Sequence, residues 1–138
     1  MTTAAHRMFE ADEASRALGM ELVEAGDGMA TVRMKITAAM VNGHEIAHGG
    51  YLFLLADTTF ACACNSHGPV TVAAGADITF VTSARLGDEL TAVAHERTRY
   101  GRNGIYDVTV YRDTPGHREV VAEFRGRSRT ISPPKDPS

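Results

Sequence analysis

NGHEIAHGGYLFLLADTTFACACNS, residues 42–66, is the stretch of this sequence that decides its fold. A polar loop ends in His48-Gly49-Gly50 and leads into residues 51–64, which are apolar on every side of a helix for about four turns. One carboxylate, Asp57, interrupts the apolar run near its middle. Carboxylates are rarely buried without a partner, because an ionised group loses several kcal/mol on leaving water. We therefore expect Asp57 to be catalytic.

The composition predicts one compact domain. A chain of 138 residues with 43% hydrophobic content can bury a core of its own but has no room for a second one. Its 14 basic and 17 acidic residues give a net charge of -3, which argues against a nucleic-acid partner. The run 51–64 is shorter than the roughly 20 residues that span a bilayer. We expect a domain over residues 1–131 that binds no nucleic acid and no membrane, and a disordered tail over residues 132–138.

The N-terminal segment predicts location and a first helix. Residues 1–18 contain acids and no uninterrupted apolar core, unlike a signal or transit peptide, so we expect a cytoplasmic protein. Residues 4–18 have the apolar spacing of one amphipathic surface helix, and Gly19 would end it. Cys62 and Cys64 are two residues apart on nearly opposite sides of a helix, so we expect two buried thiols and no disulfide.

The remaining segments predict strands. Residues 20–36 have the pattern of a hairpin around Gly26-Asp27-Gly28, and residues 38–47 form a loop. Residues 70–81, 89–100, 105–113 and 118–131 are rich in β-branched and aromatic residues and are separated by turn signals. One helix, a hairpin, a long apolar helix and a run of antiparallel strands indicate an α+β fold, in which an antiparallel sheet wraps around one central helix.

Gly49 and Gly50 lie where the long helix begins. Their amides lack acceptors within the helix, and the helix dipole adds partial positive charge, which together suit a developing oxyanion. Asp57 lies about 12 Å further along the helix axis and cannot reach a group held at that end. If the glycine amides and Asp57 belong to one active site, the carboxylate must come from a second copy of the chain. The two long helices would then run antiparallel across a two-fold interface, and each of the two sites would contain residues of both chains. The alternatives are a flexible helix start and a structural carboxylate that caps a loop or meets an arginine.

A rival motif lies in the same loop. His44, Glu45 and His48 fit H-E-x-x-H, in which two histidines on one helix face bind zinc and the glutamate is the base. The pentapeptide is enclosed by Asn42-Gly43 and Gly49-Gly50, which disfavour a helix there. A zinc hydrolase is therefore the second hypothesis, and the first includes no metal.

Basic and imidazole side chains elsewhere give weaker signals. Arg125, Arg127 and Arg129 alternate on the last strand and would share one face, where they could hold phosphates or form an ordinary solvated surface. Arg102-Asn103-Gly104, in a tight connection, is a second candidate for a phosphate or adenine contact. The remaining histidines, which have no ligand spacing, are expected at solvated positions: His6, His67, His95 and His117.

With these residues in view, the sequence resembles the hotdog-fold acyl-CoA thioesterases, and closely those of bacterial phenylacetate catabolism. The resemblance rests on Asn42, His48-Gly49-Gly50 and Asp57-Thr58 at their spacing, followed by Phe60, Ala61 and Ala63-Cys64-Asn65-Ser66. It covers residues 16–130 and continues through Asp77-Ile78-Thr79-Phe80, Leu86-Gly87-Asp88 and Phe124-Arg125-Gly126. Thr82-Ser83-Ala84 departs from the family, which often has proline at the rim of the acyl pocket.

The resemblance implies a site and a substrate. Asp57 would be the nucleophile or general base, the Gly49 amide would polarise the thioester carbonyl, and Asn42 and His48 would position substrate or water. Thr58 would be a partner of the Asp57 carboxylate, and Thr82 a water contact. The coenzyme A portion would meet residues already singled out above: Arg102, Asn103, Gly104, Arg125 and Arg127.

The family further implies hydrolysis of phenylacetyl-CoA or a hydroxylated aryl-acetyl-CoA to the acid and free coenzyme A. It implies a homotetramer built from two composite-site dimers, with no cofactor beyond the coenzyme A of the substrate. Hotdog domains also serve as acyl-CoA sensors and dehydratases, so a non-catalytic acyl-CoA-binding protein remains an alternative.

Overall fold

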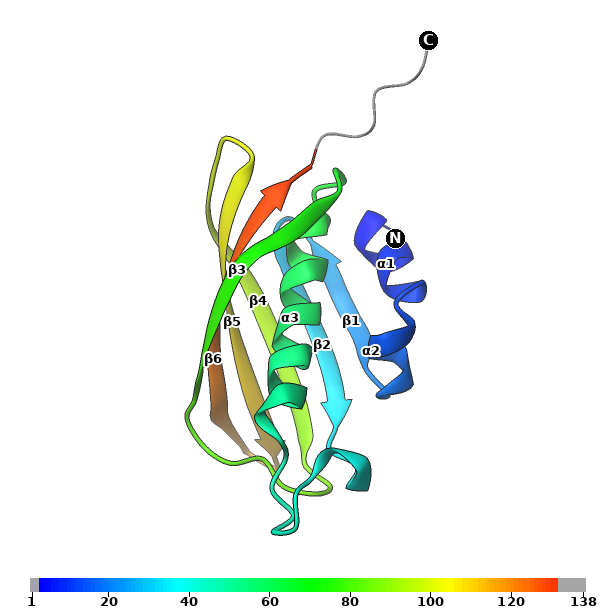
Figure 1. Cartoon of the computed structure of the whole chain (residues 1–138), viewed down its shortest axis with the longest axis vertical. Helices are drawn as coiled ribbons and strands as arrows, with labels where there is room; N and C mark the ends of the chain where they lie inside the picture. The colour runs from blue at the N-terminus through cyan, green and yellow to red at the C-terminus, as the bar shows by residue number, and fades with distance from the viewer. Residues whose placement is uncertain (1–2, 132–138) are drawn as a thin grey trace.

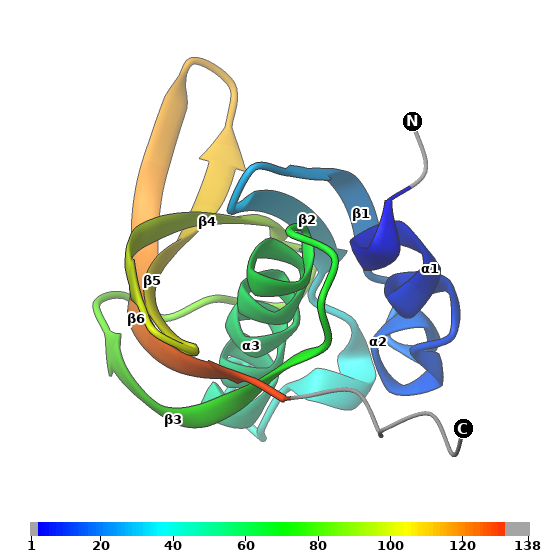
Figure 2. The same ribbon diagram turned by 90° about the horizontal axis from the view of Figure 1, so that it is seen from above.

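The computed structural model describes residues 3–131, which form a curved antiparallel sheet around one long helix (Figure 1). The sheet has six strands in the order β1-β2-β4-β5-β6-β3. The strands are β1 (Glu21–Gly26), β2 (Met29–Lys35), β3 (Thr71–Phe80), β4 (Glu89–Tyr100), β5 (Asn103–Thr114) and β6 (His117–Thr130). The helix α3 (Gly49–Asn65) lies in the concave side of the sheet, as the view along the helix in Figure 2 shows. The predicted α+β architecture is confirmed.

The sheet curves because its strands carry bulges. The register shifts between Leu22 and Glu24 in β1, between Ala73 and Gly75 in β3, and within the β4–β5 and β5–β6 pairs. A bulge bends its strand and increases the local twist, so the sheet closes around α3 instead of lying flat beside it. The predicted strands 70–81, 89–100, 105–113 and 118–131 correspond to β3 to β6.

A two-residue turn builds the predicted first hairpin. Gly26 pairs with Met29, and both residues of the turn have positive φ, 52° for Asp27 and 79° for Gly28. Two positive φ values fit a type I′ turn, whose twist matches that of the strands on either side. The predicted loop of residues 38–47 includes a short 3-10 helix, η1 (Ala38–Met40).

The N-terminal segment differs from the prediction of one helix over residues 4–18. It forms two short helices, α1 (Ala4–Glu10) and α2 (Glu13–Ala17). The break falls at Asp12, whose side chain accepts a hydrogen bond from the Ser15 amide and caps α2. Aspartate competes for backbone donors in this way, which makes it a helix start and a poor interior residue. Gly19, with φ 77°, ends the segment as predicted.

The core forms where α3 meets the strands. Phe60 lies 5.6 Å from the Tyr106 ring and 5.9 Å from the Phe124 ring, measured between centroids. Gly126 on β6 leaves room for the Phe60 ring: a Cβ there would lie 2.7 Å from one of its carbons. Cys62 and Cys64 are free and buried, as predicted, and burial raises the pKa of each thiol to about 12.

Two expectations concern the ends and the environment of the chain. The predicted disordered tail, residues 132–138, lies outside the described residues. Between residues 3 and 131, no helix has the length and apolar character needed to cross a membrane.

Gly126→Ala should destabilise the protein by about 1–3 kcal/mol, the usual cost of an overpacked core. The added methyl group would overlap the Phe60 ring, which is enclosed by Tyr106 and Phe124 and has no free direction to move. Urea unfolding measures the difference. Gly26→Ala is the matched control, because a Cβ at that strand position meets nothing within 4 Å. Equal stability of the two variants would contradict the packing argument.

Candidate active site

The start of α3 is exposed at His48 and Gly50 and is held in place by the loop before it. His48 is the N-cap residue, and its side chain makes no capping hydrogen bond. Its backbone amide donates to the Met40 carbonyl at 2.9 Å, while Ala47 donates to the Ala84 carbonyl at 2.8 Å. The loop is thus fixed at both sides, while Gly49 opens the helix without a side-chain cap. Free amides at a helix start can bind an oxyanion.

Asn42 organises this loop. Its side-chain oxygen accepts hydrogen bonds from the amides of His44 at 2.9 Å and Ile46 at 3.1 Å. This leaves the side-chain NH₂ group as the part of Asn42 that can donate to water or substrate. The local fold therefore uses the acceptor of Asn42 and keeps its donors available.

The H-E-x-x-H hypothesis requires a helix that the structure does not have. Residues 42–47 form a turn closed by a bridge between Val41 and Ala47, and Glu45 has φ 62°. His44 and His48 therefore do not lie one above the other on a helix face, as zinc binding by this motif needs. Across residues 3–131, no cluster of three or more histidine, cysteine, aspartate or glutamate side chains could hold a metal ion.

An apolar cavity of about 320 Å³ opens beside the start of α3. The structure brings two of the predicted site residues, Gly49 and Thr82, together in its wall. Phe80 covers Gly49 closely, since a Cβ on Gly49 would lie 2.6 Å from the end of the Phe80 ring. The other lining residues are Ile46, Ala47, Leu52, Val81, Ser83 and Ala84. A site of this size and character suits a small hydrophobic group next to an oxyanion-binding amide.

Asp57 lies on the one side of α3 that the sheet does not cover. Phe53 on the same side is 36% exposed, and Gly50, Leu54, Asp57 and Ala61 are also partly or fully exposed, whereas the opposite side is buried. Burial, and after it the negative charge of Asp12, raises the pKa of the Asp57 carboxyl. A raised pKa favours a proton acceptor that works near neutral pH. Asp57 does not line the cavity at Gly49 in its own chain.

Thr58 does not occupy the position expected of a partner for Asp57. It is buried, and its hydroxyl lies 2.8 Å from that of Ser15. Ser15 donates its single hydroxyl proton to Asp12 at 2.6 Å, so Thr58 must be the donor to Ser15. The Thr58 proton is therefore used between α3 and α2, and is not available to the Asp57 carboxylate.

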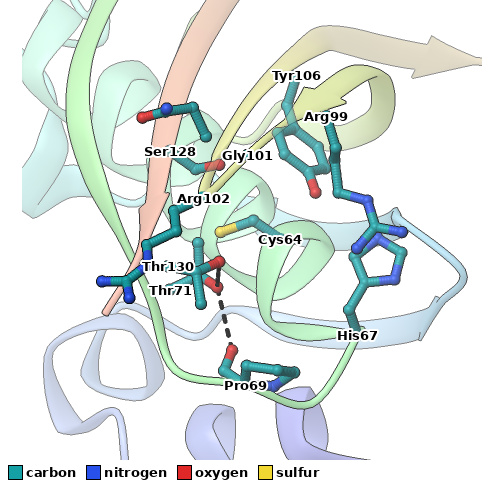
Figure 3. A pocket seen from close by; sticks show the side chains of 11 residues that line it. Cys64, His67, Pro69, Thr71, Arg99, Gly101, Arg102, Tyr106, Ser128 and Thr130 are labelled. Atoms are coloured by element: carbon teal, nitrogen blue, oxygen red, sulfur yellow. Dashed lines mark hydrogen bonds between the residues drawn. The ribbon is translucent and has the colours of Figure 1, made fainter. Parts of the chain in front are cut away.

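A second, polar cavity of about 200 Å³ lies near the far end of α3 (Figure 3). Arg102 and Asn103 line it, as do Arg99, His67 and Tyr106. Gly104 is buried just behind, where a Cβ would lie 2.8 Å from the Ser128 hydroxyl oxygen. The cavity therefore gathers the predicted 102–104 segment with side chains from β4, β6 and the end of α3.

Glu96 organises this polar region. Its Oε1 atom lies 2.8 Å from Nε2 of His67 and 3.0 Å from Nε of Arg99, and it accepts a hydrogen bond from the Tyr106 hydroxyl at 3.0 Å. These donors hold the pKa of the Glu96 carboxyl below its usual value, although burial alone would raise it. The prediction of a freely solvated His67 was wrong, because a carboxylate from β4 lies within reach. His6 is likewise engaged, with Thr3 in the cap of α1, while His95 and His117 are exposed.

Arg125 and Arg127 are on the outer face of the sheet and apart from both cavities. Arg125 forms two hydrogen bonds with Asp107, at 2.7 and 2.9 Å, and Arg127 contacts Asp77 at 3.2 Å. Asp107 in turn has a lowered pKa, chiefly because Arg125 donates to it. Their charges are therefore balanced within the sheet.

Comparison with known proteins identifies the family. A profile described as thioesterase superfamily matches residues 44–117. The acyl-coenzyme A thioesterase PaaI of Escherichia coli is 43% identical over 127 residues, which are 92% of this chain and 89% of that protein. The chain belongs to the thioesterase superfamily.

Solved structures agree with this assignment. The structure of E. coli PaaI, from the phenylacetic acid degradation operon, superposes with a TM-score of 0.88 over 94% of this chain and 91% of that chain. A variant of the phenylacetic acid degradation protein PaaI from Thermus thermophilus is 31% identical, with a TM-score of 0.81 over 87% of this chain and all of that chain, 100%. These relatives confirm the predicted hotdog fold.

One further member of the superfamily has been solved with a ligand. A hypothetical thioesterase protein from Streptococcus pneumoniae, in a structure with coenzyme A, is 25% identical. Its TM-score is 0.81, over 91% of this chain and 95% of that chain.

Asp57→Asn should raise the melting temperature at pH 7 by a few degrees. The native state raises the Asp57 pKa, so it holds the proton more tightly than the unfolded chain does, and its stability falls as pH rises through the native pKa. The neutral amide lacks this cost. The difference should shrink as pH falls toward about 3, below the ordinary aspartate pKa of about 3.9, where the carboxyl is mostly protonated in both states. Calorimetry at both pH values measures it, with the exposed turn variant Asp27→Asn as control. A lower melting temperature at pH 7 would contradict this account of Asp57.

Proposed function

We propose that the chain is an acyl-CoA thioesterase that hydrolyses phenylacetyl-CoA or a hydroxylated aryl-acetyl-CoA. The observation that carries the proposal is the opening of α3 at Gly49 onto an apolar cavity of about 320 Å³. A cavity of roughly 150 Å³ already holds benzene, so an aryl-acetyl group fits this one. Membership of the thioesterase superfamily and the 43% identity to E. coli PaaI support the same reaction.

In the proposed mechanism, the thioester carbonyl oxygen accepts a hydrogen bond from the Gly49 amide, where the helix dipole stabilises the developing negative charge. Asp57 of the partner subunit takes a proton from water, and the water oxygen attacks the carbonyl carbon. The carbon–sulfur bond then breaks, and the thiolate takes the proton from Asp57. We assign Asp57 the general-base role because its pKa is raised and its neighbour Thr58 donates elsewhere.

The other predicted side chains surround this reaction. Asn42 donates from its free NH₂ group, His48 lies at the N-cap beside the carbonyl site, and Thr82 is in the cavity wall where it can hold water. Thr58 acts through Ser15 instead of through Asp57.

A two-fold dimer would complete the site. The exposed side of α3 that contains Phe53 and Asp57 is continuous with β3, which is an edge strand of the sheet formed by residues 3–131. Along and just beyond this edge, Val72 is 44% exposed, Phe80 51% and Val81 54%. Unpaired, apolar edge strands invite pairing with another chain. Antiparallel pairing of two β3 strands would place Asp57 of one chain toward the Gly49 end of the other.

The same two-fold arrangement gives the coenzyme A portion a place. Antiparallel helices would bring the end of α3 in one chain beside the start of α3 in the other. The polar cavity of one chain would then lie next to the apolar cavity at Gly49 of its partner. We place the phosphates at Arg102 and Asn103 in that polar cavity. Arg125 and Arg127 are less suitable, because Asp107 and Asp77 already occupy their guanidinium groups. The homotetramer and the cytoplasmic location remain predictions.

Asp57→Asn should remove nearly all turnover, by roughly 10²–10⁴-fold, because an amide cannot accept the proton from water. Release of free thiol measures it, over a panel of phenylacetyl, hydroxyphenylacetyl, benzoyl and straight-chain CoA thioesters. Binding of coenzyme A and assembly should be retained. Asp27→Asn makes the same chemical change at the exposed hairpin turn and should keep wild-type activity. Near-normal turnover by Asp57→Asn would refute the proposed mechanism, and binding without turnover of any thioester by the wild type would indicate a sensor.

A mixing experiment tests the composite site. Gly49→Val should block the cavity, since even a Cβ at Gly49 would lie 2.6 Å from Phe80. Gly49→Val and Asp57→Asn should each be inactive alone. When equal amounts of the two variants are unfolded and refolded together, half of the dimers contain one chain of each. Each mixed dimer has one intact site out of two, so the mixture should recover about a quarter of wild-type activity. Gel filtration must show that Gly49→Val still assembles. Assembled mixtures without recovery would mean that each chain holds a complete site.

A further inference from the structure

The two short N-terminal helices are tied to the middle of α3 by a buried hydrogen-bond chain. Thr58 donates to Ser15 across 2.8 Å, and Ser15 donates to the Asp12 carboxylate through its hydroxyl at 2.6 Å and its amide at 3.0 Å. Ser15 is 1% exposed and Thr58 is 5% exposed. We call these three residues the Asp12 relay. It ends on the helical turn that carries Asp57.

The relay fixes the position of a charge as well as of a helix. An N-cap needs only an acceptor, and serine, asparagine or aspartate serve equally well. Asp12 places a full negative charge at the junction of α1 and α2, and that charge adds to burial in raising the pKa of Asp57. It also contributes to the raised pKa of Cys62, on the next turns of α3. The junction therefore affects this side of α3 electrostatically.

Other charges around α3 are poorly placed to act on Asp57. Strands β2, β4 and β5 present mainly buried apolar side chains to the helix, and the Tyr106 hydroxyl of β5 donates to Glu96. On α1, His6 is half-buried and bonded to Thr3. The remaining charged residues of α1 and α2 are exposed: Arg7, Glu10, Glu13 and Arg16. On β3 and β6, Asp77 and the arginines are exposed on the outer face. The thiols of Cys62 and Cys64, on α3 itself, have pKa values raised to about 12 and stay neutral at physiological pH.

We propose that Asp12 is a positioning residue of the active site: through Ser15 and Thr58 it fixes the α3 turn that carries Asp57, and it places a negative charge on the same side of that turn. The inference rests on the proposed function only for the catalytic use of Asp57. Its physical content, the coupling between the two carboxylates, can be measured with or without turnover.

Asp12→Asn tests the electrostatic part, because asparagine keeps the shape and the N-cap hydrogen bond from the Ser15 amide while removing the charge. Its NH₂ group also replaces the oxygen that accepts from the Ser15 hydroxyl, and the effect of losing that bond is measured separately with Ser15→Ala. The Asp57 carboxyl should titrate at lower pH, since a neighbouring negative charge that disfavoured its ionisation is gone. Carbon-13 NMR of aspartate-labelled protein measures this, with the Asp57 signal assigned by its absence in Asp57→Asn. Glu13→Gln, which removes an adjacent but exposed charge, is the matched control and should leave the titration unchanged. An unchanged Asp57 titration in Asp12→Asn would overturn the proposal.

The acidic limb of kcat/KM against pH connects this coupling to catalysis. It should move to lower pH in Asp12→Asn by the same amount as the NMR titration, because kcat/KM reports the free enzyme. A shifted titration with an unshifted limb would support the coupling and refute Asp57 as the base. These outcomes keep a failure of the proposed function distinct from a failure of the relay.

Ser15→Ala tests the positioning part. It breaks the relay while retaining both carboxylates, so kcat should fall several-fold at 25 °C with KM nearly unchanged, as expected when only the reacting geometry loosens. A purely structural serine would lower the melting temperature and leave kcat unaltered, and that result would overturn the positioning role.

Discussion

The structure depends on one constraint: α3 is apolar on every side, and a single sheet can cover only part of a helix. The strands supply Phe124 and Tyr106 to one side, and Gly126 lets the Phe60 ring approach the backbone of β6. The bulges curve the sheet as far around the helix as the hydrogen bonding allows. The uncovered side therefore exposes Phe53 and also contains Asp57, the carboxylate that interrupts the apolar run.

This constraint connects stability with chemistry. A carboxylate on a partly buried apolar surface is costly when ionised, and the cost is what makes it a useful base. Here the chain increases the cost further with Asp12, and it directs the Thr58 proton away from Asp57 toward Ser15. A second copy that covers the uncovered side would raise the burial of Asp57 again. The same contact would thus bury apolar surface and tune the site.

The two cavities differ in chemistry, as the two parts of the expected substrate do: the apolar cavity suits the acyl group and the polar cavity suits the coenzyme A phosphates. The apolar cavity beside Gly49 lies at the start of α3, and the polar cavity with Arg102 lies near its end. The length of α3 separates them within one chain, whereas the proposed two-fold dimer would bring the polar cavity of one chain next to the apolar cavity of its partner. The Glu96 cluster, which receives His67, Arg99 and Tyr106, keeps the polar cavity ordered and its cations arranged around an internal carboxylate.

The sequence by itself determined the elements whose signals are local. The apolar run predicted α3, the Gly26-Asp27-Gly28 turn predicted the first hairpin, and β-branched and aromatic content between turn signals predicted β3 to β6, because each depends on neighbours in the chain. The spacing of Gly49 and Asp57 also showed that one helix cannot bring them together. Tertiary structure alone decided which partners the polar side chains found. Asp12 caps α2 and so interrupts the predicted first helix, and Thr58 donates to Ser15. His67 pairs with Glu96, and Arg125 pairs with Asp107. A hydrogen bond between distant segments depends on how the sheet curves and on which donors arrive within about 3 Å, and no local pattern encodes that.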